Sequence, residues 1–275
     1  MRGWLGQTAL AGMLLAAPAM AAEVPVDLEL VLAIDISGSI DREEAALQRQ
    51  GYLAALVDPE VLRAVGLGML GRIAVSYIEW AGDGNQHLVV DWAVINDLAS
   101  AKSFAGKLAD APFQSGRWTS IAGAIDFAQP LFTANGYEGT RRVIDISGDG
   151  PNNHGPSVIA SRDRAVAAGI TINGLPIIND RLSPGGFPSL ADLDKYYAGC
   201  VIGGPGAFIV VAEDFVTFAQ AIRRKLILEI SGLPPHEAAP ANLRPAASPP
   251  GYGRGCDVGE RQIRDYYRSR PSGPD

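Results

Sequence analysis

The sequence predicts an α/β fold, with helices on both faces of a doubly wound, mainly parallel sheet that has one antiparallel edge strand. Apolar stretches of strand length alternate with amphipathic stretches of helix length, and repeated strand–helix units build parallel sheets. Several apolar stretches are nearly continuous, as in strands that are covered on both faces. The composition agrees, because 275 residues with 47% hydrophobic content can bury a substantial core.

The strands are predicted from apolar or β-branched stretches that end in turn signals. In chain order they cover residues 27–34, 72–80, 88–94, 142–147, 170–177 and 207–212. Gly82-Asp83-Gly84-Asn85 separates the second strand from the third and is typical of a hairpin turn. The third strand is therefore expected to run antiparallel to its neighbour at one edge, and 207–212 is expected to be the last strand.

The helices are predicted where apolar residues recur at helical spacing after a capping residue. In chain order they cover residues 42–57, 96–108, 121–131, 158–168, 192–197 and 213–230. Ser39 or Asp41 is expected to cap the first helix, Thr119 precedes the third, and Gly169 ends the fourth. Beyond residue 230 only a short helical turn is expected, over 262–268.

The two ends of the chain differ from this core. Residues 1–21 carry one charge, Arg2, then an apolar stretch and Ala19-Met20-Ala21, which together predict a signal peptide cleaved near Ala21/Ala22. The apolar stretch is shorter than the roughly 20 residues that span a bilayer. We therefore expect a periplasmic or secreted mature protein without a transmembrane segment. The predicted division is signal peptide 1–21, domain 22–232, Pro-rich linker 233–255 and C-terminal tail 256–275.

The net charge limits the classes of partner, and the number of cysteines indicates a disulfide. The formal net charge is −7 at pH 7, which argues against nucleic acid and anionic membranes as partners. The two cysteines, Cys200 and Cys256, form an even pair in an exported chain, so a disulfide that tethers the tail is predicted. Two separate buried thiols are the alternative.

Oxygen-bearing side chains follow three segments that reach the same edge of the predicted sheet. Asp35, Ser37 and Ser39 follow the first strand, Thr119 precedes a helix after a Gly-containing loop, and Asp149 follows strand 142–147. Ligands bind beyond the carboxyl ends of such strands, and carboxylate and hydroxyl oxygens suit a hard cation. The simpler alternative is that these residues cap a helix and form an ordinary turn.

This set of residues resembles the metal-ion-dependent adhesion site (MIDAS) of von Willebrand factor A (VWA) domains, which combines Asp-x-Ser-x-Ser with a distant Thr and a distant Asp. The resemblance covers roughly residues 25–231, and the segment 145–153 looks like a bacterial exported VWA-like family of unknown function.

The resemblance implies direct metal binding by three hydroxyls, those of Ser37, Ser39 and Thr119. It implies that Asp35 and Asp149 act mainly through water and hydroxyl hydrogens. Mg²⁺ is the expected ion, with Mn²⁺ and Ca²⁺ as alternatives.

Neutral hydroxyls leave much of the charge of such an ion uncompensated, so a Glu or Asp carboxylate of a partner protein could complete its coordination. The sequence therefore predicts an exported metal-dependent adhesion or scaffold module that binds a partner protein. The alternatives are a metal-dependent hydrolase, such as a phosphoesterase that uses Asp35, and an envelope scaffold with a structural metal. Catalysis is less favoured because His154, the one histidine near the site, is expected to be a solvated loop residue.

Two neighbouring residues are given structural roles. Asp145 lies inside an apolar strand, where a carboxylate needs a partner, and we expect a hydrogen bond to a neighbouring loop rather than a metal-binding role. Trp118 is expected either to form an apolar rim of the site or to pack beneath the loop that precedes Thr119.

Overall fold

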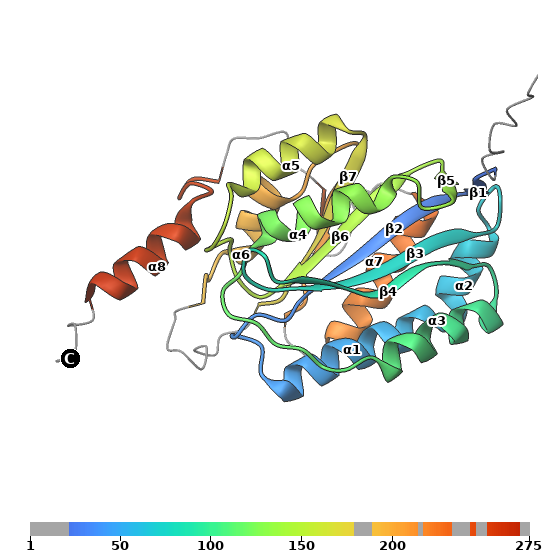
Figure 1. The fold of residues 1–275 in the computed structure, drawn as a ribbon, viewed down its shortest axis with the longest axis horizontal. Helices are drawn as coiled ribbons and strands as arrows, with labels where there is room; N and C mark the ends of the chain where they lie inside the picture. The colour runs from blue at the N-terminus through green and yellow to red at the C-terminus, as the bar shows by residue number, and fades with distance from the viewer. Residues whose placement is uncertain (1–21, 179–188, 214–216, 233–242, 246–251, 270–275) are drawn as a thin grey trace, which may run out of the picture.

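The structure is a computed structural model that describes residues 22–178, 189–213, 217–232, 243–245 and 252–269 (Figure 1). The predicted signal peptide and most of the predicted linker lie outside the described residues. Its centre is a seven-stranded sheet in the order β4-β3-β2-β6-β7-β8-β9. These strands are β2 (Leu28–Asp35), β3 (Ile73–Trp80), β4 (Gln86–Ile95), β6 (Arg142–Gly148), β7 (Ile170–Pro176), β8 (Phe208–Val210) and β9 (Leu243–Pro245).

The sheet confirms the predicted doubly wound arrangement and adds one feature at its far edge. β4 runs antiparallel to β3 at one edge, as the hairpin turn predicted. At the other edge β9 pairs antiparallel with β8, so 207–212 does not hold the last strand. β9 comes from the Pro-rich segment that was expected to be a linker, and an edge position tolerates the missing amide of Pro245. A separate two-stranded sheet joins β1 (Val24–Val26) to β5 (Tyr137–Gly139).

Helices cover both faces of the large sheet (Figure 1). The helices on one face are α1 (Arg42–Leu56), α2 (Pro59–Gly66), α3 (Leu98–Asp110) and α7 (Phe218–Ser231). The other face packs against α4 (Ile121–Ala128), α5 (Val158–Ala167), α6 (Leu193–Tyr196) and a π-helical turn (Tyr197–Val201). A last helix, α8 (Val258–Ser269), extends away from this body and is longer than the turn expected over 262–268.

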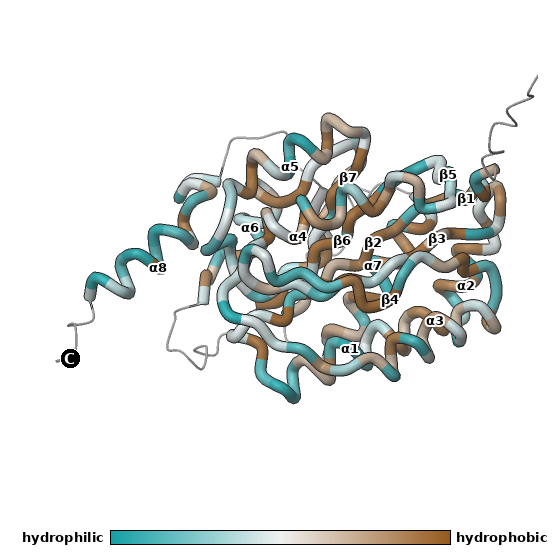
Figure 2. Tube along the Cα trace, viewed as in Figure 1, coloured by the Kyte–Doolittle hydropathy of each residue, from teal (hydrophilic) through white to brown (hydrophobic). Residues whose placement is uncertain are grey.

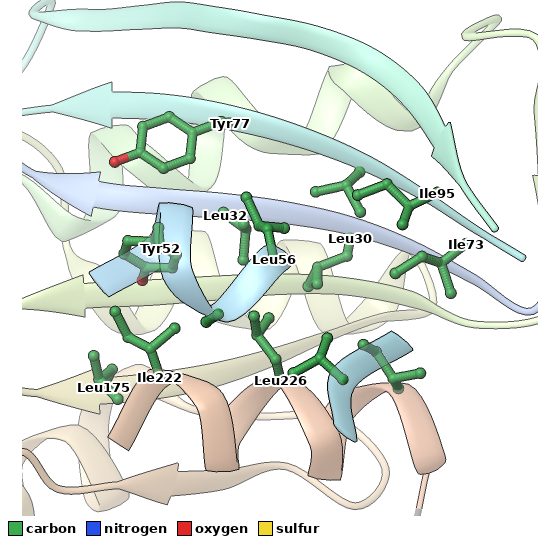
Figure 3. Packing of buried hydrophobic residues seen from close by; sticks show 14 of the residues in the cluster. Leu30, Leu32, Tyr52, Leu56, Ile73, Tyr77, Ile95, Leu175, Ile222 and Leu226 are labelled. Carbon is green, nitrogen blue, oxygen red and sulfur yellow. The ribbon is translucent and has the colours of Figure 1, made fainter. Parts of the chain in front are cut away.

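The core consists of two apolar clusters, one on each face of the sheet. Alternate residues of β2 enter different clusters, with Leu30 and Leu32 on one side and Val31 and Ala33 on the other. This two-sided burial explains why the strand is an uninterrupted apolar run. Figure 3 shows the first cluster, in which Leu30 and Leu32 lie between the sheet and the helices α1 and α7. Figure 2 shows hydrophobic colour concentrated along the central strands.

Capping residues fix where two helices begin beside the predicted site. Asp41, one of the two predicted caps, accepts hydrogen bonds from the amides of Glu43 and Glu44 at the start of α1. Ser120, not Thr119, caps α4, since its hydroxyl accepts from the amide of Gly123 at 3.1 Å. Thr119 is therefore not needed for capping, and it lies two residues before the first residue of the helix.

A buried charged triad ties α7 to the sheet. The Lys225 ammonium lies 2.5 Å from Asp145 Oδ1 and 2.5 Å from Glu229 Oε1, and all three side chains are buried. Asn173 of β7 donates to the same Glu229 oxygen at 2.9 Å. The partner of Asp145 is therefore a helix lysine, which corrects the expected bond to a neighbouring loop.

The triad predicts a pH dependence of stability. Burial, with repulsion from Glu229, raises the pKa of Asp145 to about 7 despite the nearby Lys225. The folded state therefore holds this proton more tightly than the unfolded chain does. The stability that comes from binding this proton is present at acid pH and is lost as the pH rises toward 7. Relative to Asp145→Asn, the native protein should become less stable as pH rises from about 4 to 7. Urea midpoints measured across this range test this, and parallel profiles would contradict it.

Candidate metal centre

The five predicted site residues lie at one edge of the sheet because β2 and β6 are parallel neighbours. Their register pairs Ile34 with Ser147, so the chain beyond each strand end reaches the same place. Asp35 ends β2, and Asp149 directly follows the last residue of β6. The loop before α4 brings Thr119 to this edge, and the amide of Gly116 in that loop donates to the carbonyl of Ile36 at 2.9 Å.

Four of the five residues are connected in a chain by hydrogen bonds. Asp35 Oδ1 accepts from the amide of Ser37 at 2.7 Å. The hydroxyls of Ser37 and Ser39 are 3.1 Å apart, and Ser39 donates to Asp149 Oδ1 at 2.7 Å. The structure thus joins the ends of two strands through the two serines of the Asp-x-Ser-x-Ser motif.

Thr119 lies beside this chain without joining it. A methyl group on Gly150 would lie 3.7 Å from the Thr119 hydroxyl oxygen, which places that hydroxyl next to the loop of Asp149. Among the described residues, the hydroxyl makes no hydrogen bond to the other four side chains. Its backbone is fixed by Asn153, whose side-chain oxygen accepts from the Thr119 amide and whose amide donates to the Thr119 carbonyl, both at 2.8 Å.

The two carboxylates lie in an environment that disfavours their negative charge. Burial and the nearby charge of Asp149 raise the pKa of Asp35 well above its ordinary value. Burial, with a further contribution from Glu44, raises the pKa of Asp149 to about 6, although Ser39 opposes the shift. The second oxygen of Asp35, Oδ2, is buried and has no hydrogen-bond partner within the described part of the chain.

The donor set is compatible with a hard cation. A positive ion would relieve both the unpaired Asp35 oxygen and the repulsion between the two carboxylates, and hydroxyl oxygens suit the same ions. No group of three or more His, Cys, Asp or Glu side chains in the described ranges is arranged to hold a metal. A cation at this edge would therefore depend on the hydroxyls of the serines and Thr119.

Tyr197 is a residue of this region that sequence reasoning missed. Its hydroxyl is buried and has no hydrogen-bond partner among the residues that the structure describes. A methyl group on Gly148 would lie 2.9 Å from this hydroxyl and 2.9 Å from Asp35 Oδ2, so both unpaired oxygens flank the same glycine. No sequence signal marks Tyr197, because it lies in a π-helical turn far from the motif.

Asn152 and the neighbouring aromatic rings shape the rim of the site. The side-chain oxygen of Asn152 accepts from the amide of Ala122 at 3.0 Å, which holds the loop after Asp149 against the start of α4. Trp118 has a φ of 68° and stacks on His154 with ring centroids 5.9 Å apart, at the rim rather than beneath the loop. His154 Nδ1 accepts from the amide of Asp83 at 3.0 Å, so this exposed residue also holds the hairpin turn.

A family model described as "Protein of unknown function (DUF1194)" matches residues 25–234. The chain belongs to this family. Its matched segment contains all five residues of the candidate site and ends before β9, Cys256 and α8. A comparison with curated proteins finds no match.

Solved structures with the same fold include proximal thread matrix protein 1 (PTMP1) from the mussel byssus and the pilus adhesin SpaC from Lactobacillus rhamnosus GG. PTMP1 aligns with a TM-score of 0.52 and 13% identity over 77% of this chain and 50% of its own. SpaC aligns with a TM-score of 0.55 and 15% identity over 76% of this chain and 31% of its own. The chain therefore spans half or less of these proteins.

A second PTMP1 structure, described as having a zinc-occupied MIDAS motif, aligns with a TM-score of 0.52 and 12% identity, over 77% of this chain and 50% of its own. At such identities the likeness concerns the fold, and it confirms the predicted VWA fold. No helix in the described residues has the length and apolar character needed to span a bilayer.

Proposed function

We propose that this protein is an exported, metal-dependent protein-binding module that docks an acidic side chain of a partner at the candidate metal centre. The observation that carries the proposal is the hydrogen-bonded chain from Asp35 through Ser37 and Ser39 to Asp149, beside an unpaired buried oxygen of Asp35. The negative charge of the two buried carboxylates is not compensated by any cation in this arrangement among the described residues, and a divalent ion would compensate it.

The hydroxyls of Ser37, Ser39 and Thr119 would hold the ion, and Asp35 and Asp149 would orient those hydroxyls and bound water. Mg²⁺ is the ion that we propose, with Mn²⁺ or Ca²⁺ as substitutes. When bound, the ion would supply a coordination position for a Glu or Asp carboxylate of a partner. The description of a PTMP1 MIDAS motif occupied by zinc, and of SpaC as a pilus adhesin, supports this assignment for a chain of the same fold.

Export is supported by the Cys200–Cys256 disulfide, which is present in the structure as predicted. Disulfides persist in oxidising compartments and are rare in the cytosol. We therefore propose a periplasmic or secreted location after removal of residues 1–21, with the predicted domain over 22–232 extended by β9 and by the disulfide-tethered tail.

Ser37→Ala should weaken Mn²⁺ and Mg²⁺ binding by about tenfold or more, because it removes a hydroxyl ligand and one member of the hydrogen-bonded chain. Isothermal titration calorimetry of the mature protein measures this directly. Ser103→Ala is the matched control, since Ser103 is exposed on α3, away from the site. Unchanged affinity in a folded Ser37→Ala variant would contradict the proposed metal site.

A metal-dependent hydrolase is the alternative that the same residues raise. Screening phosphate esters with added Mg²⁺ separates the two functions. Turnover that requires the metal and is lost in Asp35→Asn would replace the binding module with an enzyme. We expect no such turnover, because Nδ1 of His154 is already occupied by the amide of Asp83 and general-base catalysis needs a free, positioned group.

A further inference from the structure

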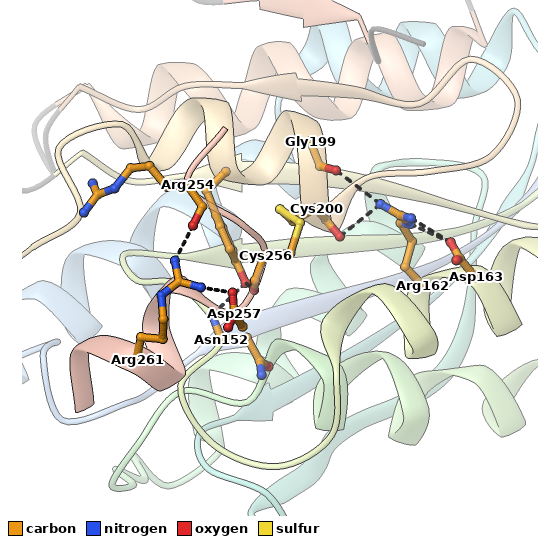
Figure 4. The surroundings of a disulfide bond; sticks show 10 residues. Asn152, Arg162, Asp163, Gly199, Cys200, Arg254, Cys256, Asp257 and Arg261 are labelled. Carbon is orange, nitrogen blue, oxygen red and sulfur yellow. Dashed lines mark hydrogen bonds and ion pairs between the residues drawn. A yellow bond between two sulfur atoms is a disulfide. The ribbon is translucent and has the colours of Figure 1, made fainter. Parts of the chain in front are cut away.

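The C-terminal helix α8 lies at the rim of the candidate metal centre. The Cys200–Cys256 disulfide closes a separation of 56 residues and anchors the chain just before α8 (Figure 4). The hydroxyl of Tyr196 accepts from the amide of Asn152 at 3.1 Å and donates to the carbonyl of Cys256 at 3.4 Å. One tyrosine therefore links the loop after Asp149 to the start of the tail.

The first turn of α8 packs directly on that loop. Asn152 donates through its side-chain nitrogen to Glu260 Oε1 at 2.8 Å. Val258 and Gly259 are buried, and a methyl group on Gly259 would clash with the carbonyl oxygen of Asn152. Only a glycine permits this approach of the helix. The contact places α8 against the segment that follows Asp149.

Aromatic rings continue the contact on the other side of the site. Tyr267 of α8 lies with its ring centroid 5.8 Å from that of Trp118, which immediately precedes Thr119. Trp118 also stacks on His154, so the helix, the Thr119 loop and the loop after Asp149 meet in one aromatic group. Tyr267 is 48% exposed, and this group therefore reaches the surface.

Helix α8 carries three arginines against two acidic residues, Glu260 and Asp265, so it is weakly basic although the whole chain is acidic. Arg264 and Arg268 are exposed and four residues apart, so they lie on the same face of the helix. Arg261 is held by Asp257 and by the carbonyl of Arg254. Figure 2 shows hydrophilic colour along most of α8, and Figure 1 shows the helix extending beyond the body. Two cationic side chains are thus presented next to a site proposed to take a carboxylate.

We propose that α8 forms the second half of the docking surface and that the partner is a protein segment with several acidic residues. One carboxylate would occupy the metal centre, and its acidic neighbours would pair with Arg264 and Arg268 across Trp118 and Tyr267. The inference rests on the proposed function and adds the partner's chemistry to it. A single carboxylate would contact only the metal, whereas an acidic cluster would contact both the metal and the arginines of α8.

Two synthetic peptides test the proposal by fluorescence polarisation with the mature protein in saturating Mn²⁺. One is a short Gly-Ser peptide with a single central Glu, and the other has Asp residues on both sides of that Glu. The acidic peptide should bind more tightly to the native protein, and added salt should reduce this preference. Arg264→Glu/Arg268→Glu should weaken acidic-peptide binding by about tenfold and single-Glu binding by less than about twofold. The same variant should bind Mn²⁺ like the native protein.

The matched control is Lys102→Glu/Lys107→Glu, which makes the same charge change at exposed positions of α3. It should leave the preference for the acidic peptide unchanged. Equal preference in the native and Arg264→Glu/Arg268→Glu proteins would overturn the proposal. Tighter binding in that variant, or in Cys200→Ser/Cys256→Ser, would also overturn it, because α8 would then obstruct the site. Failure of the native protein to bind Mn²⁺ would instead refute the proposed function, so the two failures are distinguishable.

Discussion

Replacing Lys225 by Met is expected to lower the free energy of unfolding by about 3–5 kcal/mol, the usual cost of removing one partner from a buried ion pair. The ammonium lies 2.5 Å from carboxylate oxygens of both Asp145 and Glu229. Without it, two buried carboxylates would face each other across the contact between α7 and β6. Urea unfolding at pH 7, followed by circular dichroism, measures the change.

An exposed ion pair on the same helix provides the control. Arg223 pairs with Asp58 at 3.5 Å and with Glu60 at 3.2 Å, and about half of its side chain is exposed. Arg223→Met should therefore cost less than about 1 kcal/mol. The loss in Lys225→Met should shrink at about pH 5, where the stranded carboxylates take up protons. Equal losses of unfolding free energy in the two variants would show that the buried triad stabilises the protein no more than the exposed ion pair does.

Removing the disulfide with Cys200→Ser/Cys256→Ser should lower the free energy of unfolding by about 4 kcal/mol, on the chain-entropy estimate for a loop of this length. The loop of 56 residues includes β8, α7 and β9, so the crosslink restricts a large part of the unfolded chain. Urea midpoints of the oxidised native protein and the double variant give the difference.

Two comparisons separate loss of the crosslink from the effect of the new hydroxyls. Cys200 is fully buried, so serine there adds a polar atom to the core, whereas Cys200→Ala/Cys256→Ala does not. Reduction of the native protein should give the same loss as the alanine pair. If the urea midpoint changes neither in the reduced protein nor in the alanine pair, the tail is already held by its other contacts.

Much of the fold is visible in the sequence because local patterns determine it. Three features depend only on residues that are close in the sequence. They are the continuous apolar run of β2, the turn at residues 82–85 and the cap at Asp41. α2 was missed although Asp58-Pro59 is a cap followed by a proline in the first turn, which is a recognisable start signal. The strand β9 could not be predicted, because a three-residue segment that ends in a proline becomes a strand only by pairing with β8.

The candidate site also has a part that the sequence predicts and a part that it does not. The Asp-x-Ser-x-Ser motif, the helix start after Thr119 and the strand end at Asp149 predict where five oxygen-bearing residues meet. The hydroxyl of Tyr197 beside Gly148, and the lysine that pairs with Asp145, depend on contacts between distant segments. Asn152 and Asn153 likewise hold α4 and Thr119 in place. Such partners are set by tertiary packing, which no local pattern encodes.

The position of β9 bears on how the protein should be divided for study. The family-matched segment ends at residue 234, before β9 and Cys256. A fragment cut at that boundary would expose the backbone edge of β8 and leave Cys200 as a lone thiol. Open sheet edges and lone thiols both promote association between copies. Expression of residues 22–275 should therefore yield better-behaved material than expression of the matched segment.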